Sequence, residues 1–373
     1  VGSSALYATV AGENNSAFGY RSLYCNSSGN NNHAFGFRGL YNNTTGCLNI
    51  VMGLDAGCAN TTGKNNTFIG TLAGCSNTTS SYNTAVGRMA MCGGSGGINT
   101  AIGNRALQCN TGDNNVGIGG GALSQNTSGA CNSASGYQAL NKNTTGHFNT
   151  AHGFKALYCN TTCSHNAAFG SCSLHTATSA SQVVAVGSHA LAALTSGDNN
   201  TGVGFKALTT TTTGQNNTAL GACALIVNTT GSYNTFVGYG AGHGSVTSAP
   251  YSSGGSNVAI GKNALYNISS GDYNIAIGYQ AGATASGSYN VLVGTQAGFG
   301  SQGTGPDFTG NNNTYIGSRA GQYSTTAEDS VAIGHQALFQ QLRATEAVAI
   351  GKKAMSTSTS DLHYGAIAIG AYA

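Results

Sequence analysis

Short apolar runs recur along the whole chain at a nearly constant spacing. Each run ends in a glycine, as in Asn-Thr-Ala-Val-Gly at 83–87 and Asn-Thr-Ala-Ile-Gly at 99–103. Asn, Thr and Gly interrupt the runs every eight or nine residues, so the apolar stretches are too short for helices. The pattern predicts short β-strands joined by tight turns.

The run-closing glycine, taken as position zero, defines a repeat. It occurs 22 times between Gly2 and Gly370, with a dominant spacing of 17 residues. A unit this small buries no core alone, so the repeat predicts an all-β fold, a parallel β-solenoid (β-roll) of about 22 stacked coils. We expect one continuous array over 1–373, with loop insertions at 241–257 and 297–312, which hold both prolines.

Two positions of the repeat exchange volume. Position +4 is Leu or Met in 15 units and Gly in six, and in five of those six position −2 changes from Ala or Gly to a large side chain. Examples are Phe68 with Gly74 and Phe236 with Gly242; Ala276 with Gly282 is the exception. The exchange predicts that −2 and +4 face each other inside the coil.

Position −1 then points to the opposite side of the strand, although it is large and apolar in 20 of 22 units. An apolar column exposed along the coils predicts lateral association of identical chains, most simply as a trimer; the alternative is a corner bend that turns −1 inward. The candidate interface comprises Phe18, Phe35, Ile69, Val86, Ile102, Ile118, Phe169, Val186, Ile260, Ile277, Ile333 and Ile350.

Charged residues are scarce, at 6% of the chain, and they occupy two edges. Ten of the 13 basic residues lie at +1 or +2, and eight of the ten acids lie at +10 to +12. The alternatives are two simply exposed corners or a pair of edges that sets the register between neighbouring chains. A net charge of +3 is too small to indicate nucleic-acid binding.

The units at 83–90, 99–107, 136–146 and 330–334 resemble the head repeats of YadA-like trimeric autotransporter adhesins. They are closer still to the related Asn-Thr-Ala-x-Gly-Tyr-x-Ala-Leu and Asn-Thr-Thr-Gly repeats of bacterial and viral surface and tail-fibre proteins. The resemblance covers essentially the whole chain. It implies a trimeric, left-handed β-roll on an extracellular, cell-surface or virion fibre used for attachment. The adhesin repeat is shorter, and no coiled-coil stalk or barrel anchor is visible here.

Asparagine recurs at +7 in Asn-Thr-Thr turns that match the glycosylation acceptor pattern. On turns expected to be exposed, these residues are candidate glycosylation sites; the alternatives are ordinary turn chemistry or buried amide ladders. The candidates are Asn26, Asn43, Asn60, Asn77, Asn126, Asn143, Asn160, Asn228 and a shifted copy at Asn267.

Eleven cysteines are an odd number, so at least one is free or paired between chains. Cys58, Cys75 and Cys92 share position +5 in consecutive coils, and a coil spacing of about 4.8 Å allows a disulfide ladder. Stacked free thiols are the alternative. No Cys-x-x-Cys occurs, so no metal site is expected.

Other chemistry is weakly represented. The one close carboxylate pair is Glu328-Asp329, whose adjacent side chains diverge, so we expect neither an enzyme nor a cofactor. Threonines at −3 raise a less favoured ice-binding function, although the −1 column beside them is apolar. No stretch is long enough to span a membrane.

Together these patterns predict a non-enzymatic extracellular fibre or adhesin shaft that associates laterally, and also end to end into filaments. A virus or phage receptor-binding tail fibre is the alternative function. The expected partners are further copies of the chain, with surface glycans or a host receptor binding at the insertion loops.

Overall fold

The computed structural model describes residues 2–244, 253–300, 308–340, 343–356 and 363–373. In these ranges every regular element is a β-strand, as the repeat predicts. Contacts divide the chain into two compact units, Val1–Gln182 and Val183–Ala373, which we call the N-terminal unit and the C-terminal unit. The described parts of the insertions at 241–257 and 297–312 exclude 245–252 and 301–307, where both prolines lie.

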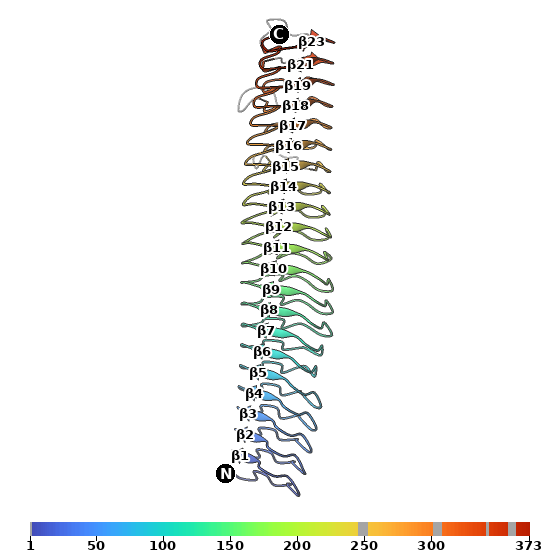
Figure 1. Cartoon of the computed structure of the whole chain (residues 1–373). Helices are drawn as coiled ribbons and strands as arrows, with labels where there is room; N and C mark the ends of the chain where they lie inside the picture. The colour runs from blue at the N-terminus through green and yellow to red at the C-terminus, as the bar shows by residue number, and fades with distance from the viewer. Residues whose placement is uncertain (1, 245–252, 301–307, 341–342, 357–362) are drawn as a thin grey trace. The chain divides into compact units, whose positions relative to one another are not determined.

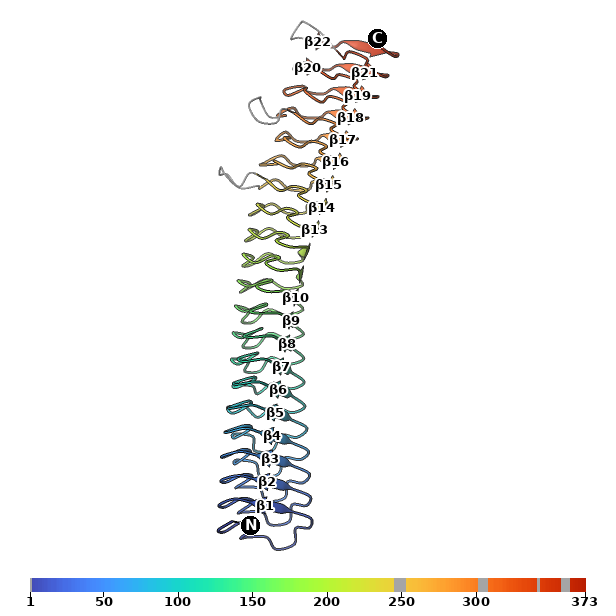
Figure 2. The ribbon, with the colours of Figure 1, turned by 90° about the vertical axis from the view of Figure 1, so that its left-hand side faces the viewer.

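Each described strand of the N-terminal unit covers positions −3 to −1 of one repeat. The strands are β1 (Ser16–Phe18), β2 (His33–Phe35), β3 (Ile50–Met52), β4 (Thr67–Ile69), β5 (Thr84–Val86), β6 (Thr100–Ile102), β7 (Val116–Ile118), β8 (Ser133–Ser135), β9 (Thr150–His152) and β10 (Ala167–Phe169). Consecutive strands pair in parallel and in register, so that Ala17 on β1 lies opposite Ala34 on β2. Figure 1 shows these strands following one another in chain order, and Figure 2 shows the same coils from the side.

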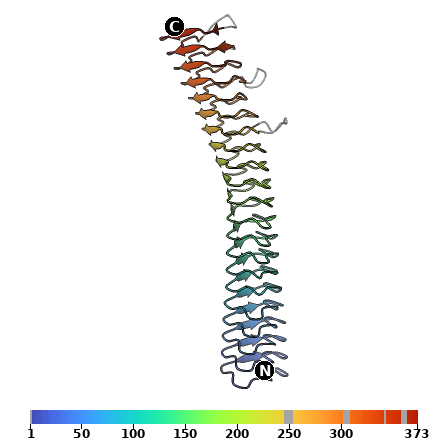
Figure 3. The ribbon, with the colours of Figure 1, turned by 90° about the vertical axis from the view of Figure 1, so that its right-hand side faces the viewer.

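The C-terminal unit repeats the arrangement. Its main strands are β11 (Val184–Val186), β12 (Thr201–Val203), β13 (Thr218–Leu220), β14 (Thr235–Val237), β15 (Val258–Ile260), β16 (Ile275–Ile277), β17 (Val291–Val293), β18 (Thr314–Ile316), β19 (Val331–Ile333), β21 (Val348–Ile350) and β23 (Ile367–Ile369). They also pair in parallel with their repeat positions aligned, and their arrows follow one edge of the coils in Figure 3. A second parallel pair joins β20 (Ala344–Thr345) to β22 (His363–Tyr364). Both units are therefore parallel β-solenoids.

The core of each coil lies between positions −2 and +4. The −2 side chains Phe68 and Phe236 are fully buried, whereas the residues on either side of them in the strand are at least partly exposed. A Cβ atom built on Gly74 would lie 2.7 Å from ring carbons of Phe68. A leucine at 74 therefore has no room while Phe68 is present. The predicted opposition of −2 and +4 is confirmed.

The contacts also explain the exception at Ala276. A Cβ atom on Gly282 would lie 2.7 Å from Leu292, the −2 residue of the next coil, and 2.9 Å from Leu265 of the preceding coil. Leu292 likewise fills the space beside Gly298, where a Cβ atom would lie 2.6 Å from it. The volume exchange thus operates between stacked coils as well as within one, so Gly282 is compensated by its neighbours.

Three positions in most coils adopt left-handed backbone, which the sequence did not indicate. In the coil of Gly36 they are Arg38, Leu40 and Leu48, with φ of 51°, 50° and 59°. An L-residue in this region costs roughly 1–2 kcal/mol, whereas burying a leucine contributes roughly 1.5–3 kcal/mol. Burial therefore offsets the strain at +4, and glycine replaces leucine there only where a large neighbour already fills the space.

Glycine at position zero is required by the stacking itself. Gly136 has a φ of 137°, and a Cβ atom on it would lie 2.7 Å from the carbonyl carbon of Gly153 in the next coil. That contact is with backbone, which cannot move aside without breaking the ladder. The close approach of consecutive coils thus selects glycine at position zero, directly after the strands of the main ladder.

Candidate functional site

The −1 column forms an exposed apolar face beside each parallel sheet. Among the predicted interface residues, Phe18 is 47% exposed, Ile102 41% and Phe169 40%. The same holds for Phe35, Ile118, Val186, Ile260, Ile277 and Ile333, while Ile69, Val86 and Ile350 are half-buried. The strand does not bend −1 inward, so the corner-bend alternative is wrong.

Aromatic side chains on this face stack along the coils. The rings of Phe18 and Phe35 lie 5.0 Å apart and nearly parallel, and His152 stacks on Phe169 at 5.2 Å. The −3 threonines lie on the same side of the strand, two residues away, and are half-buried or exposed. The face therefore combines a partly polar −3 column with an apolar −1 column.

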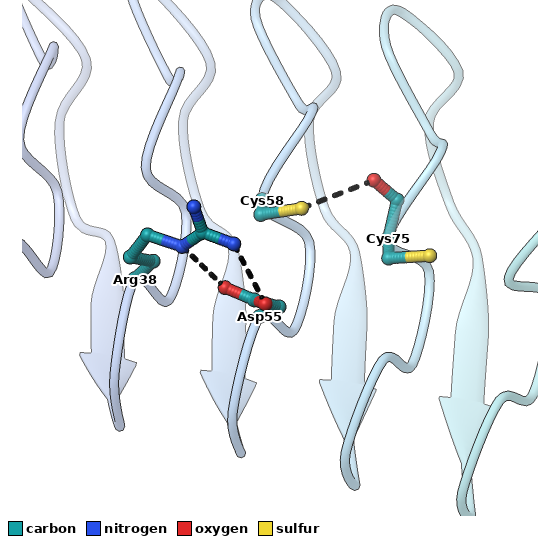
Figure 4. Close-up of polar contacts among 4 residues, drawn as sticks. All are labelled: Arg38, Asp55, Cys58 and Cys75. Carbon is teal, nitrogen blue, oxygen red and sulfur yellow. Dashed lines mark hydrogen bonds and ion pairs between the residues drawn. The ribbon is translucent and has the colours of Figure 1, made fainter.

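A second column combines aromatic rings and cations at +1 and +2. Arg21 lies 5.1 Å from the ring of Tyr20, and Lys206 lies 5.3 Å from Phe205. Arg38 donates from Nε and Nη2 to the two carboxylate oxygens of Asp55 at 2.7 and 2.8 Å, which raises the pKa of Arg38 (Figure 4). Arg38 therefore pairs with an acid at +2 of the next coil and not with an acid from the edge at +10 to +12.

The +7 asparagines are buried, which corrects the expectation of exposed turns. Asn26, Asn43, Asn60, Asn77, Asn126, Asn143, Asn160 and Asn228 are fully buried. Asn43 donates from Nδ2 to Oδ1 of Asn26 at 2.8 Å, and Asn60 donates in the same way to Asn43. A glycan on these nitrogens is incompatible with the folded coil, so the amide-ladder alternative is the one the structure supports. Asn267 is only half-buried, and glycosylation there stays a prediction.

A second amide ladder, at position −4, was not among the predicted site residues. Asn49 donates from Nδ2 to Asn32 Oδ1 at 3.1 Å and to the carbonyl of Gly63 at 2.8 Å. Its backbone nitrogen also donates to Asn32 Oδ1. The sequence does carry a signal for this ladder, since nearly every unit has an asparagine at −4. The asparagine recurs regularly because each side-chain amide needs a matching amide in the next coil.

The cysteines at +5 are stacked but not bonded to one another. Cys58, Cys75 and Cys92 are free thiols. Cys58 donates from Sγ to the backbone carbonyl of Cys75 at 3.4 Å (Figure 4), and Cys75 donates in the same way to Cys92 at 3.1 Å. Burial, followed by the neighbouring Cys75, raises the pKa values of Cys58 and Cys92. The disulfide ladder is therefore not formed, and the free-thiol alternative matches the structure.

Grooves interrupt the side-chain columns in both units. One of about 430 Å³ lies at Gly120 and Gly121 in the N-terminal unit. Another of about 260 Å³ lies in the C-terminal unit between Tyr233 and Tyr273, where Ser256 occupies the intervening coil. Glu328 and Asp329 are exposed; Glu328 forms an isolated parallel bridge with Thr345, and Asp329 lies in the bend that follows. In the described ranges no three His, Cys, Asp or Glu side chains gather as a metal site would require.

Comparison with known proteins adds no assignment. No protein-family model matches the chain, and no curated protein matches its sequence. In the residues that the structure describes, no helix has the length and apolar character needed to cross a membrane.

Proposed function

We propose that this chain is a structural shaft of an extracellular fibre or adhesin, in which identical coils associate side by side through the −1 face. The observation that carries the proposal is the in-register column of exposed apolar side chains at −1. Surface apolar residues are ordinary when scattered, but a contiguous patch is typical of an interaction site. Here the repeat makes the column contiguous in each unit, apart from Ser135 and His152 in the N-terminal unit.

A second copy of the chain fits this surface well. Its own −1 column has the same axial spacing, so the side chains of two copies meet at matching intervals. Three copies around a common axis would bury every −1 column, which is why we favour a trimer. Self-association of this kind also accounts for the apolar side chains that no other described element covers.

The oligomeric state tests the proposal. We expect mass photometry and sedimentation to give a mass well above the 37.2 kDa chain. Replacing Phe18 and Phe35 by Glu introduces charge into the −1 column, and the mass is expected to fall toward that of the single chain. Both side chains are exposed, so the circular dichroism of the coils should not change.

The matched control uses the neighbouring column. Tyr20 and Phe37 stack at 5.2 Å at position +1, and they are 41% and 44% exposed. Replacing both by Glu should leave the assembled mass unchanged. A wild-type chain that is monomeric at micromolar concentration, or two variant pairs that dissociate equally, would contradict the proposal.

A further inference from the structure

The groove of about 430 Å³ in the N-terminal unit lies where two side-chain columns are missing a residue. Gly120 and Gly121 occupy +1 and +2 of one coil, and no other unit lacks side chains at both positions. The coil before supplies Arg105 to the lining, and the coil after supplies Tyr137. The groove is therefore an open gap, one coil wide, between the side chains of the coils before and after it.

An aromatic ring forms one wall. A Cβ atom on Gly120 would lie 3.5 and 3.7 Å from two ring carbons of Tyr137, so that ring borders the empty position. Its other side stacks on Phe154 at 5.8 Å, and the side chain is 54% exposed. The ring is thus supported by the protein on one side and open to the groove on the other. Such a ring can stack on the C–H face of a sugar.

The floor and rim are rich in amides. Asn141 is 6% exposed and donates from Nδ2 to the carbonyl of Gly121 at 2.7 Å and to Ser124 Oγ at 3.1 Å. Gln125 and Gln138 also line the groove and are more exposed. Amides offer donors and acceptors side by side, as adjacent sugar hydroxyls require.

The charge around the groove is positive. Between 88 and 187 the chain carries Arg88, Arg105, Lys142 and Lys155 but only one acid, Asp113. Arg105 is exposed, and among the described residues no carboxylate forms an ion pair with it. An unpaired guanidinium binds a carboxylate through two parallel hydrogen bonds.

We propose that this groove binds an acidic oligosaccharide, with a sugar ring against Tyr137, hydroxyls on the amides and a carboxylate on Arg105. A single-stranded nucleic acid also stacks on tyrosine, but its phosphates need several cations along the strand, and the lining holds one. The proposal goes beyond the shaft function and does not depend on lateral association, because the lining residues lie at +1 to +6 and none of them is at −1.

Calorimetric titration with a tetrasaccharide of β-1,4-linked mannuronate tests the binding, with β-1,4-linked mannotetraose as its neutral counterpart. We expect the acidic sugar to bind at least about tenfold more tightly than the neutral one. Arg105→Gln should remove that preference, whereas Arg88→Gln in the preceding coil should keep it.

Gly120→Tyr supplies the missing side chain and should abolish binding. The Cβ atom has ordinary contact distances there, so the coil should fold as before. Ser171→Tyr places the same side chain at the same repeat position outside the groove and should bind normally. The proposal is overturned if wild type binds neither sugar more tightly than about 1 mM, if Gly120→Tyr still binds, or if an oligothymidylate displaces the sugar. Mass photometry of the same variants shows whether they still associate, so that loss of sugar binding can be told apart from loss of lateral association.

Discussion

The N-terminal and C-terminal units build the same coil with different side chains at position +7. In the N-terminal unit this position is an asparagine ladder, as at Asn43 and Asn143. In the C-terminal unit the buried residues at +7 are mixed, with Leu194, Ile268 and Ala285 beside the polar Thr211 and Asn228. Both units keep the −4 asparagine ladder and the −2/+4 core. The coil therefore depends on the core and on one amide ladder, and it accepts either amides or apolar groups at +7.

The ends of the +7 ladder show why amide and apolar side chains do not alternate freely at this position. The Oδ1 atoms of Asn77 and Asn160 are buried without a hydrogen-bond partner. The next +7 residues are Gly94 and Ala177, which have no amide to donate. Each interruption leaves one buried acceptor unpaired, and a long uninterrupted ladder keeps the number of such ends small.

The largest expected effect concerns the core that both units share. Phe68→Ala in the N-terminal unit and Phe236→Ala in the C-terminal unit should each lower the free energy of unfolding by about 3–5 kcal/mol. The cause is the same in both, because each ring fills the space beside a glycine at +4. Urea denaturation followed by circular dichroism measures the change.

Paired substitutions sharpen this result. Phe68→Ala combined with Gly74→Leu, or Phe236→Ala with Gly242→Leu, restores the common Ala and Leu pair of the repeat. We expect each pair to recover most of the loss, since leucine already adopts this backbone in other coils. If the free energy of unfolding recovers in one unit and not in the other, the two units do not share the same core packing.

A smaller effect should distinguish the units at +7. Asn43→Leu leaves the Asn26 carbonyl oxygen and one Asn60 amide hydrogen unpaired, which should reduce the free energy of unfolding by about 2–4 kcal/mol. Leucine is the natural residue at 194 in the C-terminal unit, where it is fully buried. The adjacent Asn42 is exposed, so Asn42→Leu is the control and should change stability little. Equal effects at 42 and 43 would show that the ladder does not stabilise the coil.

The smallest expected effect is a pH dependence in the N-terminal unit, which holds ten of the eleven cysteines. Cys58 and Cys92 have pKa values raised above 9.0, mainly by burial, so the folded chain keeps these thiols protonated after the unfolded chain begins to ionise. Their contribution to stability is present below pH 9.0 and is lost as the pH rises through the folded-state values.

Thiol alkylation followed by peptide mass spectrometry checks this directly. At a pH of about 8.5, Cys58 and Cys92 should react more slowly than an ordinary thiol. Cys109 and Cys131 are exposed and should be modified first. If the fold causes the slow alkylation of Cys58 and Cys92, unfolding the chain in urea should make the alkylation rates of all these cysteines equal. Rapid modification of Cys92 in the folded chain would mean that the thiol is not held by its surroundings.

The sequence predicted the parts of the fold that depend on period and volume. The 17-residue repeat placed each strand before its glycine, and the exchange between −2 and +4 identified the core before any coordinates. The alternation within the strand also placed −1 outside. These inferences succeeded because side-chain direction in a strand follows from position alone.

The turns were harder to predict because side-chain direction there depends on the backbone. Asn-Thr-Thr indicated a turn correctly, but not that Asn43 points inward while the residues after it are less buried. The left-handed positions of one coil hold residues as different as Arg38 and Leu48, so no single side-chain type marks them. The gap at Gly120 follows from the sequence, whereas the ring of Tyr137 beside it is a tertiary contact.

The glycine at position zero also determines how such a chain can change in length. A point substitution there meets the backbone of the next coil, but adding or deleting one whole 17-residue unit leaves each remaining coil with a neighbour of the same shape. Deletions that remove only part of a strand or its following glycine shift every later ladder out of alignment. Duplication of whole repeats is therefore the tolerated route of variation, and alleles of such a gene should differ in length by multiples of the repeat.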